Sequence, residues 1–241
     1  MTVTVRLTDI CLDVSANQQH QTLKGLFLRR TRNPRQINRI LDVPLFEAKK
    51  GDKICVVGRN GQGKTTLLKV ISKIYRPTAG TVWTSFKPTA VLAAGIGLED
   101  DFTVQENIEF TLLLNNISAK RMAKISQSIL EFCDLQQDRK KQYKHLSSGY
   151  KSRLAFAIAI SNEPKILVLD EVLGGGDEFF MKKASRKLKD SIIQSETAFI
   201  ATHGPDDFRD ICNRIIVVDQ SKIVFDGKFD QGLSFYRNLF D

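Results

Sequence analysis

The glycine-rich segment Gly58-Arg59-Asn60-Gly61-Gln62-Gly63-Lys64-Thr65-Thr66 constrains the fold of this chain more than any other stretch. An apolar run at residues 54–57 precedes it, and apolar residues at helical spacing follow it to residue 71. The order strand, loop, helix, with the pattern G-x-x-x-x-G-K-[ST], predicts a loop that binds phosphate groups. Glycine permits backbone conformations in which successive N–H groups turn towards one anion, and the helix N-terminus adds a positive dipole end.

The residue types in this loop also predict individual contacts. Lys64 is expected to pair with the β- and γ-phosphates of a nucleotide, and the Thr65 hydroxyl to bind Mg²⁺. The full set expected at the phosphates is Gly58, Asn60, Gly61, Gly63, Lys64, Thr65 and Thr66.

Composition narrows the class of protein. The 241 residues suffice for one large domain with a subdomain, and the net charge of +9 favours a phosphate-rich or membrane-surface partner without deciding between them. The four cysteines lack the spacing of a zinc site or a disulfide framework. Because no apolar stretch approaches the ~18 residues of a membrane span and the N-terminus does not resemble a signal peptide, we expect a soluble intracellular protein.

A pair of carboxylates, Asp170 and Glu171, follows the apolar strand predicted at residues 166–169. Open α/β sheets bind ligands at the carboxyl ends of their strands. There Asp170 would hold Mg²⁺, directly or through water, and Glu171 would orient or deprotonate an attacking water. The alternative is a helix N-cap that complements the helix dipole, which the phosphate loop makes less attractive.

Three further segments are candidates. His203 ends the strand predicted at residues 198–202, which favours a catalytic role, although a lone histidine is more often structural. Ser147, Ser148 and Gly149 begin a helix and suit an anion, although a serine there is usually only a cap. The glycine-rich turn that ends at Asp177 precedes a basic helix.

Residues 15–41 contain no acidic side chain but carry Lys24, Arg29, Arg30, Arg32, Arg35 and Arg39. Two interpretations stay open: a segment at an anionic membrane or a phosphorylated ligand, or a solvated basic loop. Elsewhere, alternation predicts an edge strand through residue 14, and residues 104–134 read as helical with a break near 115–118. A hairpin about Gln220-Ser221 and a C-terminal helix end the chain.

The phosphate loop, Leu-Ser-Ser-Gly-Tyr, Ile-Leu-Val-Leu-Asp-Glu, Gly-Gly-Gly-Asp and Ala-Thr-His occur here in one order. Together they resemble the ATP-binding subunit of an ABC transporter, across essentially the whole chain. The resemblance implies an α/β fold: a P-loop NTPase of the ABC type with a mixed sheet core, an N-terminal antiparallel β-subdomain and a helical subdomain. It further implies that residues 1–241 form a single nucleotide-binding domain whose helical subdomain covers about residues 95–162.

The resemblance also assigns roles. In that family two copies form a head-to-tail dimer, with each ATP between the phosphate loop of one copy and the signature segment of the other. Ser147, Ser148 and Gly149 would then contact the nucleotide of the partner copy, and Asp177 would cross the interface. Asp170 corresponds to the magnesium carboxylate, Glu171 to the general base and His203 to the switch histidine.

Within the family, the segments around Ser148, around Leu23 and after Glu171 look like the branch that exports O-antigen, capsule and teichoic acid. That likeness implies ATP hydrolysis that powers transport of a lipid-linked polysaccharide. The expected partners are a membrane-spanning permease, in two copies, and a second copy of this chain. The expected location is peripheral, on the cytoplasmic face of a bacterial plasma membrane. Exporters of a drug or a small lipid remain alternatives.

Two departures from the family pattern leave roles open. The usual glutamine is missing near Ala94, and Glu99, Asp100 or Asp101 could replace it. The aromatic residue that stacks on adenine is also missing, and Arg39 or an apolar side chain could take its place. A nucleic-acid-associated ABC ATPase is a poorer match, since the chain has one phosphate loop and no long heptad repeat. We therefore expect no nucleic-acid partner.

Overall fold

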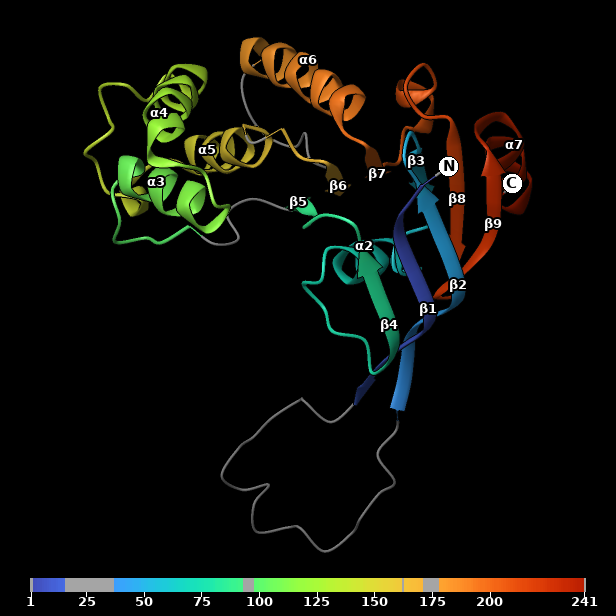
Figure 1. The fold of residues 1–241 in the computed structure, drawn as a ribbon. Helices are drawn as coiled ribbons and strands as arrows, with labels where there is room; N and C mark the ends of the chain where they lie inside the picture. The colour runs from blue at the N-terminus through green and yellow to red at the C-terminus, as the bar shows by residue number, and fades with distance from the viewer. Residues whose placement is uncertain (1, 16–36, 93–97, 162, 171–177, 241) are drawn as a thin grey trace, which may run out of the picture.

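The computed structural model describes residues 2–15, 37–92, 98–161, 163–170 and 178–240. Two sheets and several helices pack in layers, with the helices α3 and α4 to one side of the sheets (Figure 1). The helices are α2 (Lys64–Ile71), α3 (Val104–Leu114), α4 (Ala119–Cys133), α5 (Ser148–Ile160), α6 (Glu178–Gln194) and α7 (Phe229–Phe240). The short 3₁₀ turns are η1 (Tyr143–His145) and η2 (Pro205–Phe208).

The smaller sheet is antiparallel, with the order β2-β1-β4. Its strands are β1 (Val3–Ser15), β2 (Ile37–Lys49) and β4 (Ala79–Thr84). The prediction that the first strand lies at an edge is wrong. β1 pairs with β2 on one side and β4 on the other, because residues as distant as Lys49 and Thr84 align with its N-terminal half.

The larger sheet has six strands in the order β5-β6-β7-β3-β8-β9. They are β5 (Thr89–Leu92), β6 (Ile166–Asp170), β7 (Thr197–Ala201), β3 (Lys53–Val57), β8 (Arg214–Asp219) and β9 (Lys222–Lys228). All neighbours are parallel except β8 and β9, which form the predicted hairpin. Gln220 and Ser221 turn that hairpin with φ of 45° and 66°.

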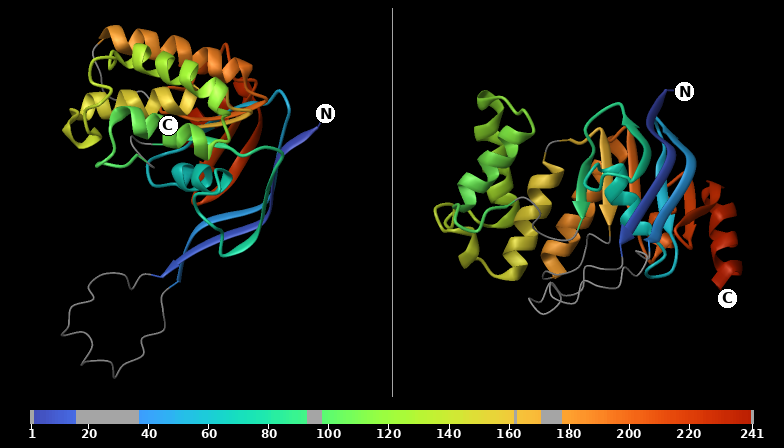
Figure 2. Two further views of the ribbon diagram at one scale, coloured as in Figure 1. Left: turned by 60° about the vertical axis from the view of Figure 1, so that its left-hand side comes forward. Right: turned by 90° about the horizontal axis from the view of Figure 1, so that it is seen from below.

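The four central strands of the larger sheet, β6, β7, β3 and β8, are buried on both faces, as their continuous apolar runs require. Along β3, Ile54 and Val56 join a core shared with α2 and the smaller sheet. The alternate residues Cys55 and Val57 join a second core that includes α5, α6 and α7. The helix α2 therefore covers one face of this sheet, while α5 and α6 cover the other; Figure 2 shows the same layers from two further sides.

The third core lies among α3, α4 and α5. A capping box between Thr103 and Glu106 starts α3, and Asn115 ends it, so the predicted break between two helices is confirmed. The mixed sheet, the antiparallel sheet and this helical layer confirm the predicted α/β class. Among the described residues, no helix has the length and apolarity that a membrane span requires.

A buried lysine at the start of β3 gives the fold a distinct pH dependence. Lys53 Nζ donates to the backbone carbonyl of Ser195 and, at 2.8 Å, to the Ser195 hydroxyl. Burial lowers the pKa of Lys53 from 10.5 to about 8. Between these two values the unfolded chain binds more protons than the folded chain, so stability increases as the pH rises through this window.

We expect Lys53→Met to remove this increase. The free energy of unfolding of the unmodified protein should rise by on the order of 2 kcal/mol from pH ~8 to ~10.5 relative to that of the variant. Urea unfolding at a series of pH values measures both slopes. Tyrosine titration affects both proteins alike, so identical slopes would show that Lys53 keeps an ordinary pKa in the fold.

Candidate functional site

Three neighbouring parallel strands lead into segments that the sequence singled out. The phosphate loop follows β3, Asp170 is the last residue of β6, and His203 lies two residues beyond β7. These strands are adjacent in the order β6-β7-β3, and parallel strands end at the same edge of a sheet. The fold thus brings the loop, the half-buried Asp170 and the exposed His203 to one edge.

The backbone of the loop depends on glycine at its first position. Gly58 has φ of +154°, and a Cβ there would lie 2.2 Å from the carbonyl oxygen of Val218 on β8. Gly63, the residue before α2, has φ of +108°. A larger residue at position 58 would clash with the Val218 backbone, so only glycine lets the first residue of the loop lie this close to β8.

Lys64 is the first residue of α2 and is 5% exposed. Its ammonium nitrogen donates to the carbonyl oxygens of Gly58 at 2.7 Å and Arg59 at 3.1 Å. These bonds hold the positive charge over the loop backbone. Thr65 and Asn60 are exposed and Thr66 is half-buried. The donors expected at a phosphate therefore surround one loop at a helix N-terminus, which is an arrangement suited to anions.

Sequence reasoning missed the support that the β8–β9 turn gives to this loop. The Gln62 side chain accepts from the Gln220 backbone N–H at 2.7 Å, and the Gln62 carbonyl accepts from the Ser221 N–H at 3.0 Å. The Ser221 carbonyl in turn accepts from Asp42 N–H at 2.8 Å. No sequence pattern predicts these contacts, because the partners lie far apart along the chain and each bond involves at least one backbone group.

The serine segment lies on a different layer. Ser147 caps α5, and its hydroxyl accepts from the Tyr150 N–H at 3.4 Å, so the ordinary capping role is present. Ser148 and Ser147 are exposed, and Gly149 is half-buried. The helices α5 and α2 cover opposite faces of the larger sheet. Within one chain, the serine segment and the phosphate loop therefore begin helices in different layers.

The acidic stretch after residue 97 forms ion pairs with a lysine of η1 and with a lysine in the first turn of α5. Asp100 lies 3.2 Å from Lys151 Nζ and Asp101 lies 2.8 Å from Lys144 Nζ. The hydrogen bond from Lys144 lowers the pKa of the Asp101 carboxyl. These two carboxylates thus neutralise lysines beside the serine segment.

Of the other residues that the sequence analysis singled out, Arg39 forms an ion pair and several lie outside the described residues. The Arg39 guanidinium bonds to the Asp13 carboxylate at 3.1 Å, which places it beside β1. Glu171, Asp177, Ala94 and the basic residues 24–35 lie outside the described residues.

Comparisons with known proteins agree with this arrangement. A family model described as "ABC transporter" matches residues 41–174. A teichoic acids export ATP-binding protein of Listeria innocua is 32% identical over 83% of this chain and 59% of its own length. An O-antigen export system ATP-binding protein of Yersinia enterocolitica is 35% identical over 76% of this chain and 77% of its own. A teichoic acids export ATP-binding protein of Staphylococcus saprophyticus is 31% identical over 95% and 90%.

The coverage of the relatives differs, and solved structures also resemble this chain. The chain spans about three fifths of the length of the Listeria proteins it matches. Among solved structures, a dimeric ATP-binding cassette bound to ADP and Pi aligns with a TM-score of 0.72 at 21% identity, over 93% of this chain and 98% of the other. An ATP-binding subunit of an ABC transporter aligns with a TM-score of 0.74 at 16% identity. The structural likeness establishes the fold, which is that of an ABC ATPase cassette.

Proposed function

Because the chain belongs to the ABC transporter family, we propose that it hydrolyses ATP to power export of a lipid-linked polysaccharide, such as O-antigen, capsule or teichoic acid, across the cytoplasmic membrane. The similarity to teichoic acid and O-antigen export ATP-binding proteins carries this proposal. In two of these relatives it covers at least three quarters of both chains, so it is not confined to the nucleotide motifs.

We assign the catalytic roles to residues that come at or just after the carboxyl ends of β3, β6 and β7 in the sequence. Lys64 neutralises the β- and γ-phosphates, and the glycine-rich backbone with Asn60 and Thr66 positions them. Thr65 and Asp170 offer the hydroxyl and carboxylate oxygens that Mg²⁺ prefers, and a bound Mg²⁺ would neutralise negative charge on the phosphates. Glu171 accepts the proton of the attacking water, and His203 orients the γ-phosphate.

We further propose that two copies complete each site. The phosphate loop and the serine segment begin helices on opposite faces of the larger sheet. One nucleotide can therefore contact both segments more readily if each comes from a different chain. Ser147, Ser148 and Gly149 of one copy would contact the phosphates held by the other, with Asp177 at the interface. Residues 1–241 then act as one nucleotide-binding domain, in which residues 95–162 form the helical subdomain.

The exposed face of α3 is the proposed docking site for the permease. Phe110, Leu113 and Leu114 are 38%, 58% and 57% exposed, and Phe110 packs edge-on against Phe102 with ring centroids 5.7 Å apart. Clustered apolar side chains on a surface mark interaction sites. This contact would hold the chain peripherally on the cytoplasmic face of the plasma membrane, where residues 24–39 would meet the anionic end of the lipid-linked substrate.

Loss of this chain should stop polysaccharide export and leave lipid-linked polysaccharide inside the cell. Cells of the source organism that lack the chain test this by surface staining and by extraction of the lipid-linked material. The unmodified chain should restore export. Leu113→Asp/Leu114→Asp should not, although the purified variant should keep its basal ATPase, because neither side chain belongs to the nucleotide site.

The matched control is Lys140→Asp, an exposed position outside α3, which should restore export fully. Normal surface polysaccharide in the deleted cells would contradict the proposed substrate class. Full export with the double variant would contradict only the docking site.

A further inference from the structure

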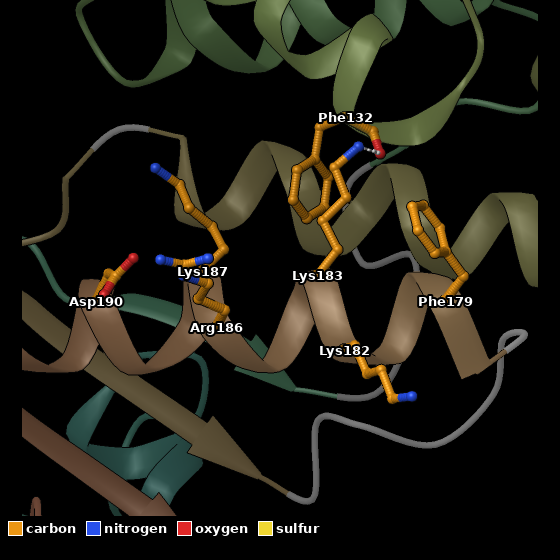
Figure 3. Close-up of a pocket in the computed structure, with 7 residues that line it drawn as sticks. All are labelled: Phe132, Phe179, Lys182, Lys183, Arg186, Lys187 and Asp190. Carbon is orange, nitrogen blue, oxygen red and sulfur yellow. Dashed lines mark hydrogen bonds between the residues drawn. The ribbon is translucent and has the colours of Figure 1, made fainter.

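Two adjoining pockets form a groove between α4 and α6, on the sheet face opposite α2. Their volumes are about 490 and 500 Å³, and both are lined by Phe132 and Lys187, so they are continuous. Figure 3 shows the α6 part, with Phe132 and Lys183 close together across the two helices and Lys182 pointing away from Phe132.

The groove is strongly basic. Lys120, Arg121 and Lys124 line it from α4, and Lys182, Arg186 and Lys187 line it from α6. Among the described residues that line it, only Asp190 and Glu163 carry a carboxylate. Within the part of the chain that the structure describes, Lys120, Arg121, Lys124, Arg186 and Lys187 make no ion pair or side-chain hydrogen bond. Side chains of like charge that line one groove repel one another, and an anionic ligand would reduce that repulsion.

Apolar side chains accompany the charge. Phe179 is 76% exposed, and the half-buried Phe132 and Ile125 line the same groove. Lys183 Nζ donates to the Phe132 carbonyl at 3.1 Å and lies 4.8 Å from the centre of its ring. This lysine fixes α6 to the end of α4, so the two walls of the groove are joined before any ligand binds.

We propose that this groove binds an acidic segment of a partner protein, with carboxylates along the basic side chains and an apolar side chain against Phe132 and Phe179. The nucleotide site, the dimer and the α3 surface do not use these residues, so the proposal stands apart from the export function. Aromatic anchors flanked by cations are the features by which a groove selects an acidic, partly apolar peptide.

The geometry favours this occupant over other anions. A bilayer surface is flat, whereas these residues line a hollow. A small phosphate needs converging, partly buried donors, whereas these six cations are exposed and spread over two helices. A nucleic-acid strand carries uniform charge, which Asp190 and Glu163 would repel. A peptide can space its carboxylates to avoid both.

The test measures binding of a fluorescein-labelled peptide of repeating Glu-Glu-Leu units by anisotropy at physiological ionic strength. The unmodified protein should bind it, and Lys124→Glu/Arg186→Glu/Lys187→Glu should weaken binding by about tenfold or more. The control Lys140→Glu/Lys189→Glu/Lys228→Glu changes the net charge equally at exposed positions outside the groove, and should change affinity by less than about twofold.

Both triple variants should keep their ATPase and thermal midpoint, which excludes unfolding as a cause. Parallel titrations use phosphatidylserine vesicles, a single-stranded oligonucleotide and inorganic pyrophosphate. Equal weakening by the two triple variants would overturn the proposal, as would absence of peptide binding. Tighter, groove-dependent binding of any of the other three probes would overturn it in favour of that class of ligand.

Discussion

Glu171→Gln should bind ATP with near-normal affinity but hydrolyse it roughly 10²–10⁴-fold more slowly, which is the usual contribution of a positioned general base. The amide keeps the size of the side chain and removes only its capacity to accept a proton. Because ATP then persists between the two copies, the variant should also form an ATP-dependent dimer. Steady-state phosphate release measures the first effect, and size-exclusion chromatography with and without ATP measures the second.

Two controls separate this role from others. Lys64→Ala should weaken nucleotide binding itself, since it removes the charge that the phosphates contact. Glu131→Gln, an exposed carboxylate on α4, should leave both binding and turnover unchanged. Hydrolysis by Glu171→Gln at close to the normal rate would exclude Glu171 as the base.

A mixture of Lys64→Ala and Gly149→Glu chains should recover ATPase activity that neither variant has alone. In a mixed dimer, one site combines the intact phosphate loop of the Gly149→Glu copy with the intact serine segment of the other. With random pairing, half of the dimers are mixed and each has one intact site, so we expect roughly a quarter of normal activity. Gly149 tolerates the change within its own chain, since a Cβ there would meet only Ser147 Oγ, at 3.9 Å.

The matched control places both changes in one chain and mixes it with the unmodified chain. Those mixed dimers contain no intact site, so they should add nothing to the activity of the unmodified dimers. Phosphate release over a series of mixing ratios distinguishes the two cases. If the complementary variants stay inactive together, either each site lies within one chain or both sites must act at once.

The local features of this protein could be predicted from its sequence. The strand before Gly58 and the helix that starts at Lys64 follow from patterns over a few residues, and the structure has both. The Gln220-Ser221 turn was likewise predictable from polar residues between two apolar runs.

Features that depend on pairing between distant segments could not be predicted. The alternation of apolar and polar residues along β1 indicates that one face is buried, but it does not indicate how many strands pair with β1. The prediction of an edge strand is wrong for this reason, since β1 pairs with both β2 and β4. The backbone contacts from Ser221 to Gln62 leave no trace in side-chain type. The groove between α4 and α6 also arises only when the two helices meet, since each alone reads as an ordinary basic helix.

The central place of β3 bears on how the chain acquires its fold during synthesis. Lys53 of this strand pairs with Ala198 on one side, and Ile54 pairs with Arg214 on the other. Both neighbours leave the ribosome long after β3, so the strand keeps two unsatisfied edges until the last part of the chain emerges. Contacts so distant in sequence slow folding and expose strand edges to aggregation. The strand that leads into the nucleotide loop therefore gains both of its neighbours only after residues 197–219 have been made.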